Sequence, residues 1–305
     1  MLVPKRFGPH STEPTIHNLV LPLHRAELWV GLCAAGGMAL LWLALMGRRS
    51  TAPIGPLLAG GVLVGMWAEV IRPPTGLIVG LAVLALGGAV AERPPARPLA
   101  AVGASIPGAL ILAFGAGLPS AAWIRLAVLI TVTLGGALID DFDRHWKGMT
   151  PLLLAIASAG AYYTVPDTEH ALVLLGATVG VLVLGGPFSS AAHRAYGPLI
   201  CGVYAWVVVV EASTRSSSAL AALACLGVLI VEPASRLIGR CDVFSRLRAT
   251  PLQALVIAFV QLLLVVALHA LGHRLAPTAT AASIVGLLGG LTLVAVIIAR
   301  AMPRT

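Results

Sequence analysis

The chain has 305 residues, of which 58% are hydrophobic and only 10% are charged, and its formal net charge is +8. Its mean hydropathy of +0.96 excludes an ordinary soluble domain, because such a domain needs a charged surface. The basic residues stand at the ends of apolar runs and form no patch, which argues against a nucleic-acid partner. The composition therefore predicts an all-α, polytopic membrane protein.

Apolar runs follow one another along the whole chain. A membrane-spanning helix needs about 20 mostly apolar residues, and the sequence divides into about eleven such runs, with breaks at charged residues, prolines and glycines. The predicted spans are 27–47, 54–71, 75–91, 98–117, 121–139, 150–165, 170–187, 197–212, 217–232, 251–272 and 279–299. We expect a single transmembrane domain, 27–300, between an N-terminal tail, 1–26, and a short C-terminal tail, 301–305.

The basic residues of the loops predict the orientation of these spans. The loops after odd-numbered spans, together with the C-terminus, carry roughly twice as many lysine and arginine residues as the opposite side. The positive-inside rule then places the N-terminus outside and the C-terminus in the cytoplasm. The predicted location is the inner (plasma) membrane, and the loop after the fifth span is predicted to be cytoplasmic.

Three aspartates, Asp140, Asp141 and Asp143, lie close together at the end of the fifth span, in a chain with 12 acidic residues. We expect Asp140 and Asp141 to end that helix, and Thr150 and Pro151 to open the next one as N-cap and first-turn proline. Adjacent carboxylates favour a divalent cation, and Mg²⁺ suits one or two carboxylates together with phosphate oxygens. The alternative is a solvated cytoplasmic loop that only fixes the topology.

The same segment resembles a known family, the polyprenyl-phosphate sugar-1-phosphate transferases, which include phospho-N-acetylmuramoyl-pentapeptide transferase. The resemblance lies in an apolar run ending in Gly135 and Gly136, then the aspartate pair, then Lys147 before the next span. It implies that Asp140 and Asp141 are catalytic and face the cytoplasm. In the family this aspartate pair serves magnesium and the phosphate acceptor. From the chemistry of the side chains we expect Asp140, Asp141 and Asp143 to hold magnesium, and Arg144 and Lys147 to bind substrate phosphate.

Two further segments match this family more loosely. The segment 92–103 looks like the family's loop with proline and arginine ahead of the aspartate motif. The segment 185–194 falls where the family has an Asn- and Asp-rich nucleotide motif. In its place stand Gly185, Gly186, Phe188, Ser189 and Ser190, with His193 and Arg194 as candidates for substrate binding. We expect 185–194 to approach Asp140 and Asp141, and the departures indicate a divergent member.

Three functions stay open at this point. The first is transfer of a sugar-1-phosphate from a UDP-sugar to a polyprenyl phosphate, with Mg²⁺, in envelope glycan synthesis. The second is an intramembrane prenyltransferase, although the fifth residue of the DDxxD pattern of that class is Arg144 here. The third is a non-catalytic scaffold or lipid-binding partner of other membrane proteins that retains the transferase fold.

Other polar residues of the spans carry weaker signals. Glu69 and Glu211 lie near predicted span ends, where interfacial placement explains them. His269 and His273 stand one helical turn apart, but a metal site would need a further ligand. Arg125 lies inside the fifth span, where it either extends toward the interface or pairs with a partner.

Overall fold

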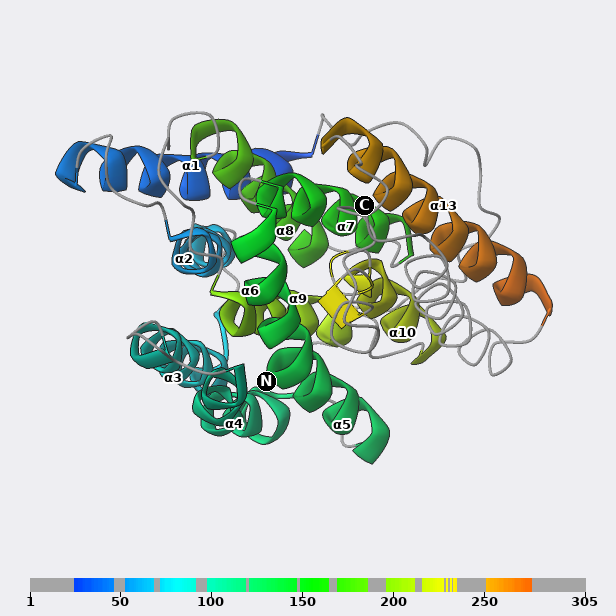
Figure 1. The fold of residues 1–305 in the computed structure, drawn as a ribbon, viewed down its shortest axis with the longest axis horizontal. Coiled ribbons are helices and arrows are strands. Elements are labelled where there is room, and N and C mark those ends of the chain that lie inside the picture. Colours follow the sequence, from blue (N-terminus) through cyan, green and yellow to red (C-terminus); the bar gives the residue numbers. More distant parts are fainter. Residues whose placement is uncertain are drawn as a thin grey trace, which may run out of the picture.

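The computed structural model describes residues 25–46, 53–68, 72–91, 98–118, 121–146, 149–164, 169–185, 196–211, 216–227, 229, 231, 233–234 and 251–275. Within these ranges every regular element is a helix and no strand is present (Figure 1), which confirms the predicted all-α class. The predicted eleventh span, 279–299, lies outside the described residues, as does most of the N-terminal tail.

The helices follow the predicted spans closely. They are α1 (Ala26–Met46), α2 (Ile54–Ala68), α3 (Thr75–Ala91), α4 (Pro98–Gly115), α5 (Ala122–Ile130), η2 (Thr131–Gly135), α6 (Gly136–His145), α7 (Thr150–Thr164), α8 (Glu169–Gly180), η3 (Val181–Gly185), α9 (Gly197–Glu211), α10 (Ser216–Cys225) and α13 (Pro251–Leu275). Among the described residues, one helix, Ala122–Asp143, is long and apolar enough by length and composition to cross a membrane, and the other apolar helical stretches are 10–17 residues long.

Two of these helices contain a π-helical turn. The elements α5, η2 and α6 follow each other without a break, and η3 continues α8 in the same way. Each π-turn ends at the first glycine of a Gly-Gly pair, Gly135–Gly136 or Gly185–Gly186. Because a π-turn adds one residue to an α-helix, it rotates the side chains that follow by about 100° around the axis. The turn η2 therefore helps to set the direction of the aspartates in α6.

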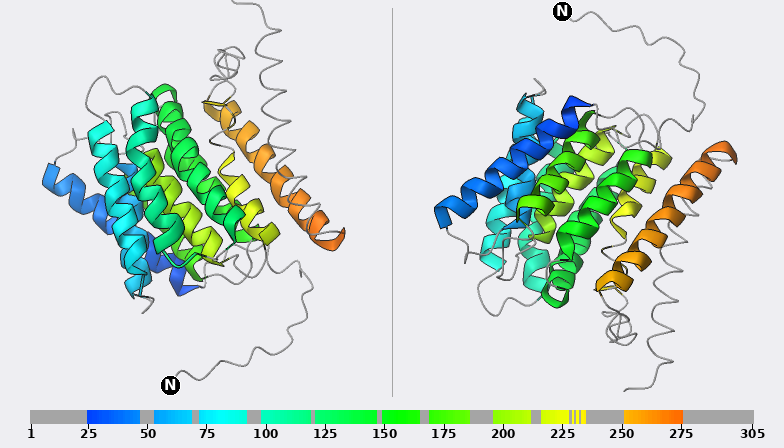
Figure 2. Two further views of the ribbon diagram at one scale, coloured as in Figure 1. Left: turned by 90° about the horizontal axis from the view of Figure 1, so that it is seen from below. Right: turned by 90° about the horizontal axis from the view of Figure 1, so that it is seen from above.

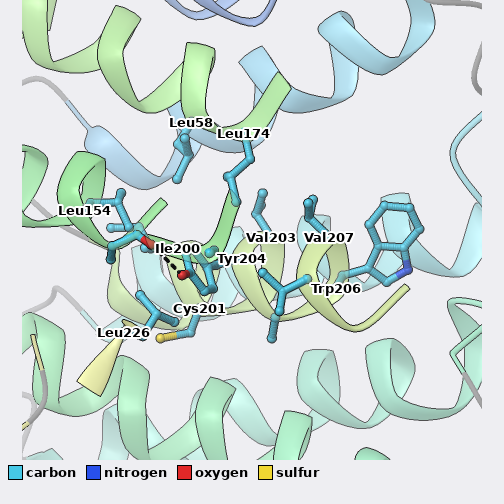
Figure 3. Packing of buried hydrophobic residues seen from close by; sticks show 14 of the residues in the cluster. Leu58, Leu154, Leu174, Ile200, Cys201, Val203, Tyr204, Trp206, Val207 and Leu226 are labelled. Atoms are coloured by element: carbon cyan, nitrogen blue, oxygen red, sulfur yellow. Dashed lines mark hydrogen bonds between the residues drawn. The ribbon is translucent and has the colours of Figure 1, made fainter. Parts of the chain in front are cut away.

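Helix α9 forms the centre of the described bundle (Figure 1). It contacts α2, α3, η2, α6, α8 and α10, and almost every side chain described in it is buried. The fully buried Tyr204 places its hydroxyl 2.9 Å from the carbonyl oxygen of Ala157 in α7 and 3.0 Å from that of Ala222 in α10. Figure 3 shows Tyr204 among apolar side chains of the surrounding helices. This hydroxyl joins three helices in the interior.

Glycines bring two pairs of helices into very close contact. A Cβ atom on Gly176 or Gly180 of α8 would overlap the carbonyl oxygens of Leu28 and Leu32 in α1. In the other direction, a Cβ atom on Gly31 of α1 would overlap a backbone carbonyl of α8. Small residues four positions apart allow this approach. Helices α3 and α4 pack in the same manner, while α1 and α13 lie at opposite sides of the bundle (Figure 2).

Candidate functional site at the end of helix α6

The three aspartates lie within α6, whose last residue is His145. The expectation that Asp140 and Asp141 end the helix is therefore wrong, and so is the polar loop predicted to start there. The helix continues for more than a turn, and Trp146 still donates its backbone N–H to the carbonyl oxygen of Phe142 at 2.8 Å. A charged side chain outside an apolar layer does not interrupt the backbone hydrogen bonds of a helix. The predicted span and the observed helix therefore end at different residues.

Asp140 contacts the first residue of α9. Its Oδ1 accepts a hydrogen bond of 2.6 Å from the backbone N–H of Gly197. The first N–H groups of a helix have no partner within it, and the next residue, Pro198, has no N–H to offer. The carboxylate also lies at the positive end of the dipole of α9. Asp140 thus caps a helix that begins 57 residues later in the chain.

The backbones of α6 and α9 meet at this point. A Cβ atom on Gly197 would overlap the carbonyl oxygen of Gly136, and a Cβ atom on Gly136 would collide with Pro198. The preceding residue, Tyr196, has a φ of 52°, which is rare for a residue other than glycine. Its ring packs where a Cβ atom on Gly88 of α3 would stand. The start of α9 is therefore held between α3 and α6.

Asp143 makes the corresponding contact with α7. It is only 5% exposed, and its Oδ1 accepts a hydrogen bond of 2.8 Å from the hydroxyl of Thr150. Thr150 is the first residue of α7, so the N-cap position predicted for it belongs to Met149 instead. The carbonyl oxygen of Met149 accepts the N–H of Leu153 at 3.0 Å, as expected of an N-cap residue. The threonine hydroxyl bonds to α6 and not to its own helix.

The side chain of Asp141 points in a different direction from those of Asp140 and Asp143. At about 100° per residue, Asp140 and Asp143 lie near one face of α6, whereas Asp141 points well away from both. Its side chain is half-buried. Among the described residues, no three His, Cys, Asp or Glu side chains are grouped to hold a metal ion. A magnesium ion held by one or two carboxylates and by substrate phosphate does not need such a group, so the donor set fits that mode of binding.

The residues predicted to bind substrate are only partly described. Lys147, His193 and Arg194 lie outside the described residues, and Arg144 belongs to α6 but its side chain is not described. Of the segment 185–194, which was expected to approach Asp140 and Asp141, only Gly185 is described, as the last residue of η3. The residue that bonds to Asp140, Gly197, follows this segment by three positions.

The other polar candidates are placed as follows. His269 is buried in α13, but the side chain of His273 lies outside the described part, as do Glu69 and the side chain of Glu211. The guanidinium of Arg125 lies 5.1 Å from the ring centre of Phe114 in α4, a distance typical of a cation–π contact. Of the two alternatives for Arg125, the structure therefore shows a pairing with an aromatic ring.

The sequence interpretation predicted the helix starts at Thr150 and Gly197 but missed that the aspartates bond to them. Thr150 and Gly197 each precede a proline, Pro151 and Pro198, and each opens a helix. A proline in the first turn removes one N–H group that would otherwise need an acceptor, and Asp140 accepts a remaining one, that of Gly197. The repeated pattern, a first helical residue followed by proline, was the sequence signal for these two helix starts. Sequence alone did not show which acceptor would reach each helix.

No family model matches the chain, and neither a curated protein nor a solved structure is similar to it. At the end of α6, Asp140 and Asp143 bond to the starts of two other helices, and Asp141 lies on a different face.

Proposed function

We propose that the chain is a multi-pass protein of the plasma membrane, with about eleven spans and a cytoplasmic C-terminus. Large apolar side chains on the outer surface of the bundle support this. Leu45, Trp67 and Leu86 are 75%, 74% and 68% exposed, far more apolar surface than a protein in water usually presents. Trp29 and Trp123 are also exposed and stand in the first turns of α1 and α5, as in the aromatic belts of membrane proteins.

Cysteine labelling tests this orientation. In a variant without native cysteines, Lys147→Cys should react with a membrane-impermeant maleimide only after the cells are opened. Ser11→Cys, in the N-terminal tail, should react in intact cells and serves as the control for the outer side. If Lys147→Cys is labelled in intact cells, the orientation is inverted, and a reaction with a cytoplasmic UDP-sugar is excluded with it.

We propose further that the protein transfers a sugar-1-phosphate from a UDP-sugar to a polyprenyl phosphate at the cytoplasmic face. The observation that carries this is the gathering of two helix starts, of α7 and α9, around the aspartates of α6. Helix N-termini favour anionic groups, and both reactants of this transfer are anions. The proposal also draws on the resemblance of the segment around Asp140 and Asp141 to the transferases.

In this reaction a phosphate oxygen of the lipid forms a bond to the phosphorus next to the sugar, and UMP leaves with the electrons of the broken P–O bond. Magnesium, held by the carboxylate of Asp141 together with a substrate phosphate, would offset charge on the attacking and leaving oxygens. Asp141 is suited to accept a proton from the lipid phosphate. Lys147 is assigned to the phosphate groups.

Release of UMP is the direct test. Purified protein in detergent, supplied with Mg²⁺, polyprenyl phosphate and a panel of UDP-sugars, should release UMP from at least one of them. Release should require the lipid phosphate, because hydrolysis by water is not the proposed reaction. If no UDP-sugar yields UMP while a known transferase does so under the same conditions, the enzymatic proposal is wrong.

A second function, a non-catalytic scaffold or lipid-binding partner of other membrane proteins, is favoured by one observation. Asp140 and Asp143 already bond to α9 and α7, so two of the three carboxylates have a role in the fold without any substrate. This function predicts that the protein binds polyprenyl phosphate, or a membrane protein, without releasing UMP.

A further inference from the structure

We infer that Asp140 and Asp143 are positioning residues that fix the first turns of α9 and α7 to α6, and that Asp141 is the carboxylate of the cluster that meets the substrate. The assignment of Asp141 rests on the proposed function. The part concerning Asp140 and Asp143 rests on their contacts alone. Asp140 and Asp143 thus have a positioning role, and Asp141 has a role in substrate contact.

The geometry of α6 separates the aspartates in this way. Asp140 and Asp143 stand three positions apart, so both lie near one face of the helix, and each gives one oxygen to another helix. The acceptor distances of 2.6 Å and 2.8 Å are those of good hydrogen bonds to a carboxylate. Asp141 lies on a different face, so a substrate could reach it without breaking either contact.

The two contacts matter because of what lies beside them in the chain. Thr150 follows Lys147 by three positions, and Gly197 follows Arg194 by three positions. Lys147 is proposed to bind substrate phosphate, and Arg194 is a candidate for substrate binding. Loss of either contact would release a helix start next to one of them. An error of about 1 Å in the placement of a substrate-binding group can reduce a rate about 100-fold.

Paired substitutions distinguish a positioning residue from one that meets substrate or metal. Asparagine at position 140 keeps an oxygen that can accept the N–H of Gly197, whereas alanine does not. Asp140→Ala should lower the unfolding temperature in detergent by about 4 °C or more and reduce kcat/KM for UMP release by about 100-fold. Asp140→Asn should restore most of both, with kcat/KM within about tenfold of the original.

The contact between Asp143 and Thr150 allows a stricter test, since both partners are side chains. Asp143→Ala and Thr150→Val should each lower the unfolding temperature, and the double variant should be little worse than the worse single one. Additive effects of the two substitutions would show that the contact is not formed. Asp143→Asn should again restore stability, because its amide oxygen can accept the hydroxyl of Thr150.

The outcomes separate this inference from the proposed function. If Asp140→Asn keeps its unfolding temperature but loses UMP release as fully as Asp140→Ala, Asp140 meets substrate or metal and the inference is overturned for it. An unchanged unfolding temperature in Asp140→Ala overturns the contact itself. If the unmodified protein releases no UMP, the transferase proposal fails, while the unfolding temperatures still decide whether Asp140 and Asp143 hold α9 and α7.

Discussion

Replacing Gly176 with alanine is expected to lower the unfolding temperature, whereas the same replacement at Gly37 should leave it unchanged or raise it slightly. Both residues lie inside helices, where alanine is favoured over glycine by about 1 kcal/mol. At Gly37 an added Cβ atom meets nothing within 4 Å. At Gly176 it would overlap the carbonyl oxygen of Leu28, a backbone atom that cannot rotate away. Overpacking costs about 1–3 kcal/mol, enough to outweigh the helix preference.

Thermal unfolding in one detergent measures this difference directly. A net loss of about 1 kcal/mol corresponds to a shift of about 2–4 °C in a domain of this size or slightly smaller. Gly180→Ala should behave like Gly176→Ala, because its Cβ atom would lie 2.6 Å from the carbonyl oxygen of Leu32. Gly103→Ala is a second control, with no atom nearby. If Gly176→Ala is as stable as Gly37→Ala, α1 and α8 do not pack at this point.

The existence and limits of most helices could be predicted from the sequence, because apolar runs and their breaks have a direct physical meaning. Prolines mark the starts of α4 at Pro98 and of α13 at Pro251, as expected for a residue that fits the first turn of a helix. The partners of the helices could not be predicted. Small residues such as Gly31 and Gly176 indicate close packing, but nothing local shows that α1 lies against α8.

The aspartates show a second limit of the sequence interpretation. It grouped Asp140, Asp141 and Asp143 because they are neighbours, and it ended the helix at Asp140 and Asp141 because charge marks the border of an apolar layer. Because α6 continues to His145, all three aspartates lie within one helix. The helical period then places Asp141 on a different face from Asp140 and Asp143. The partner of Asp140 lies 57 residues away, and the π-turn that precedes α6 was not predicted from the sequence. Both features depend on tertiary packing.

Replacing Asp141 with asparagine is expected to abolish UMP release, or the binding of polyprenyl phosphate, while expression and thermal stability stay nearly unchanged. Asparagine has the size of aspartate but cannot accept a proton as a base or neutralise a metal ion. Asp242→Asn is the matched control, since it makes the same chemical change in the arginine-rich segment between α10 and α13. That variant should keep both UMP release and lipid binding.

The dependence on magnesium should change with Asp141 as well. Mg²⁺ gives up its water reluctantly and usually needs substrate phosphates to complete its shell, so the protein alone should bind it only weakly. Polyprenyl phosphate should therefore strengthen the apparent affinity for Mg²⁺, and Asp141→Asn should remove that effect. If Asp141→Asn keeps full UMP release and the same response to Mg²⁺, the carboxylate meets neither substrate nor metal. The aspartates would then serve the fold alone, through the contacts of Asp140 and Asp143.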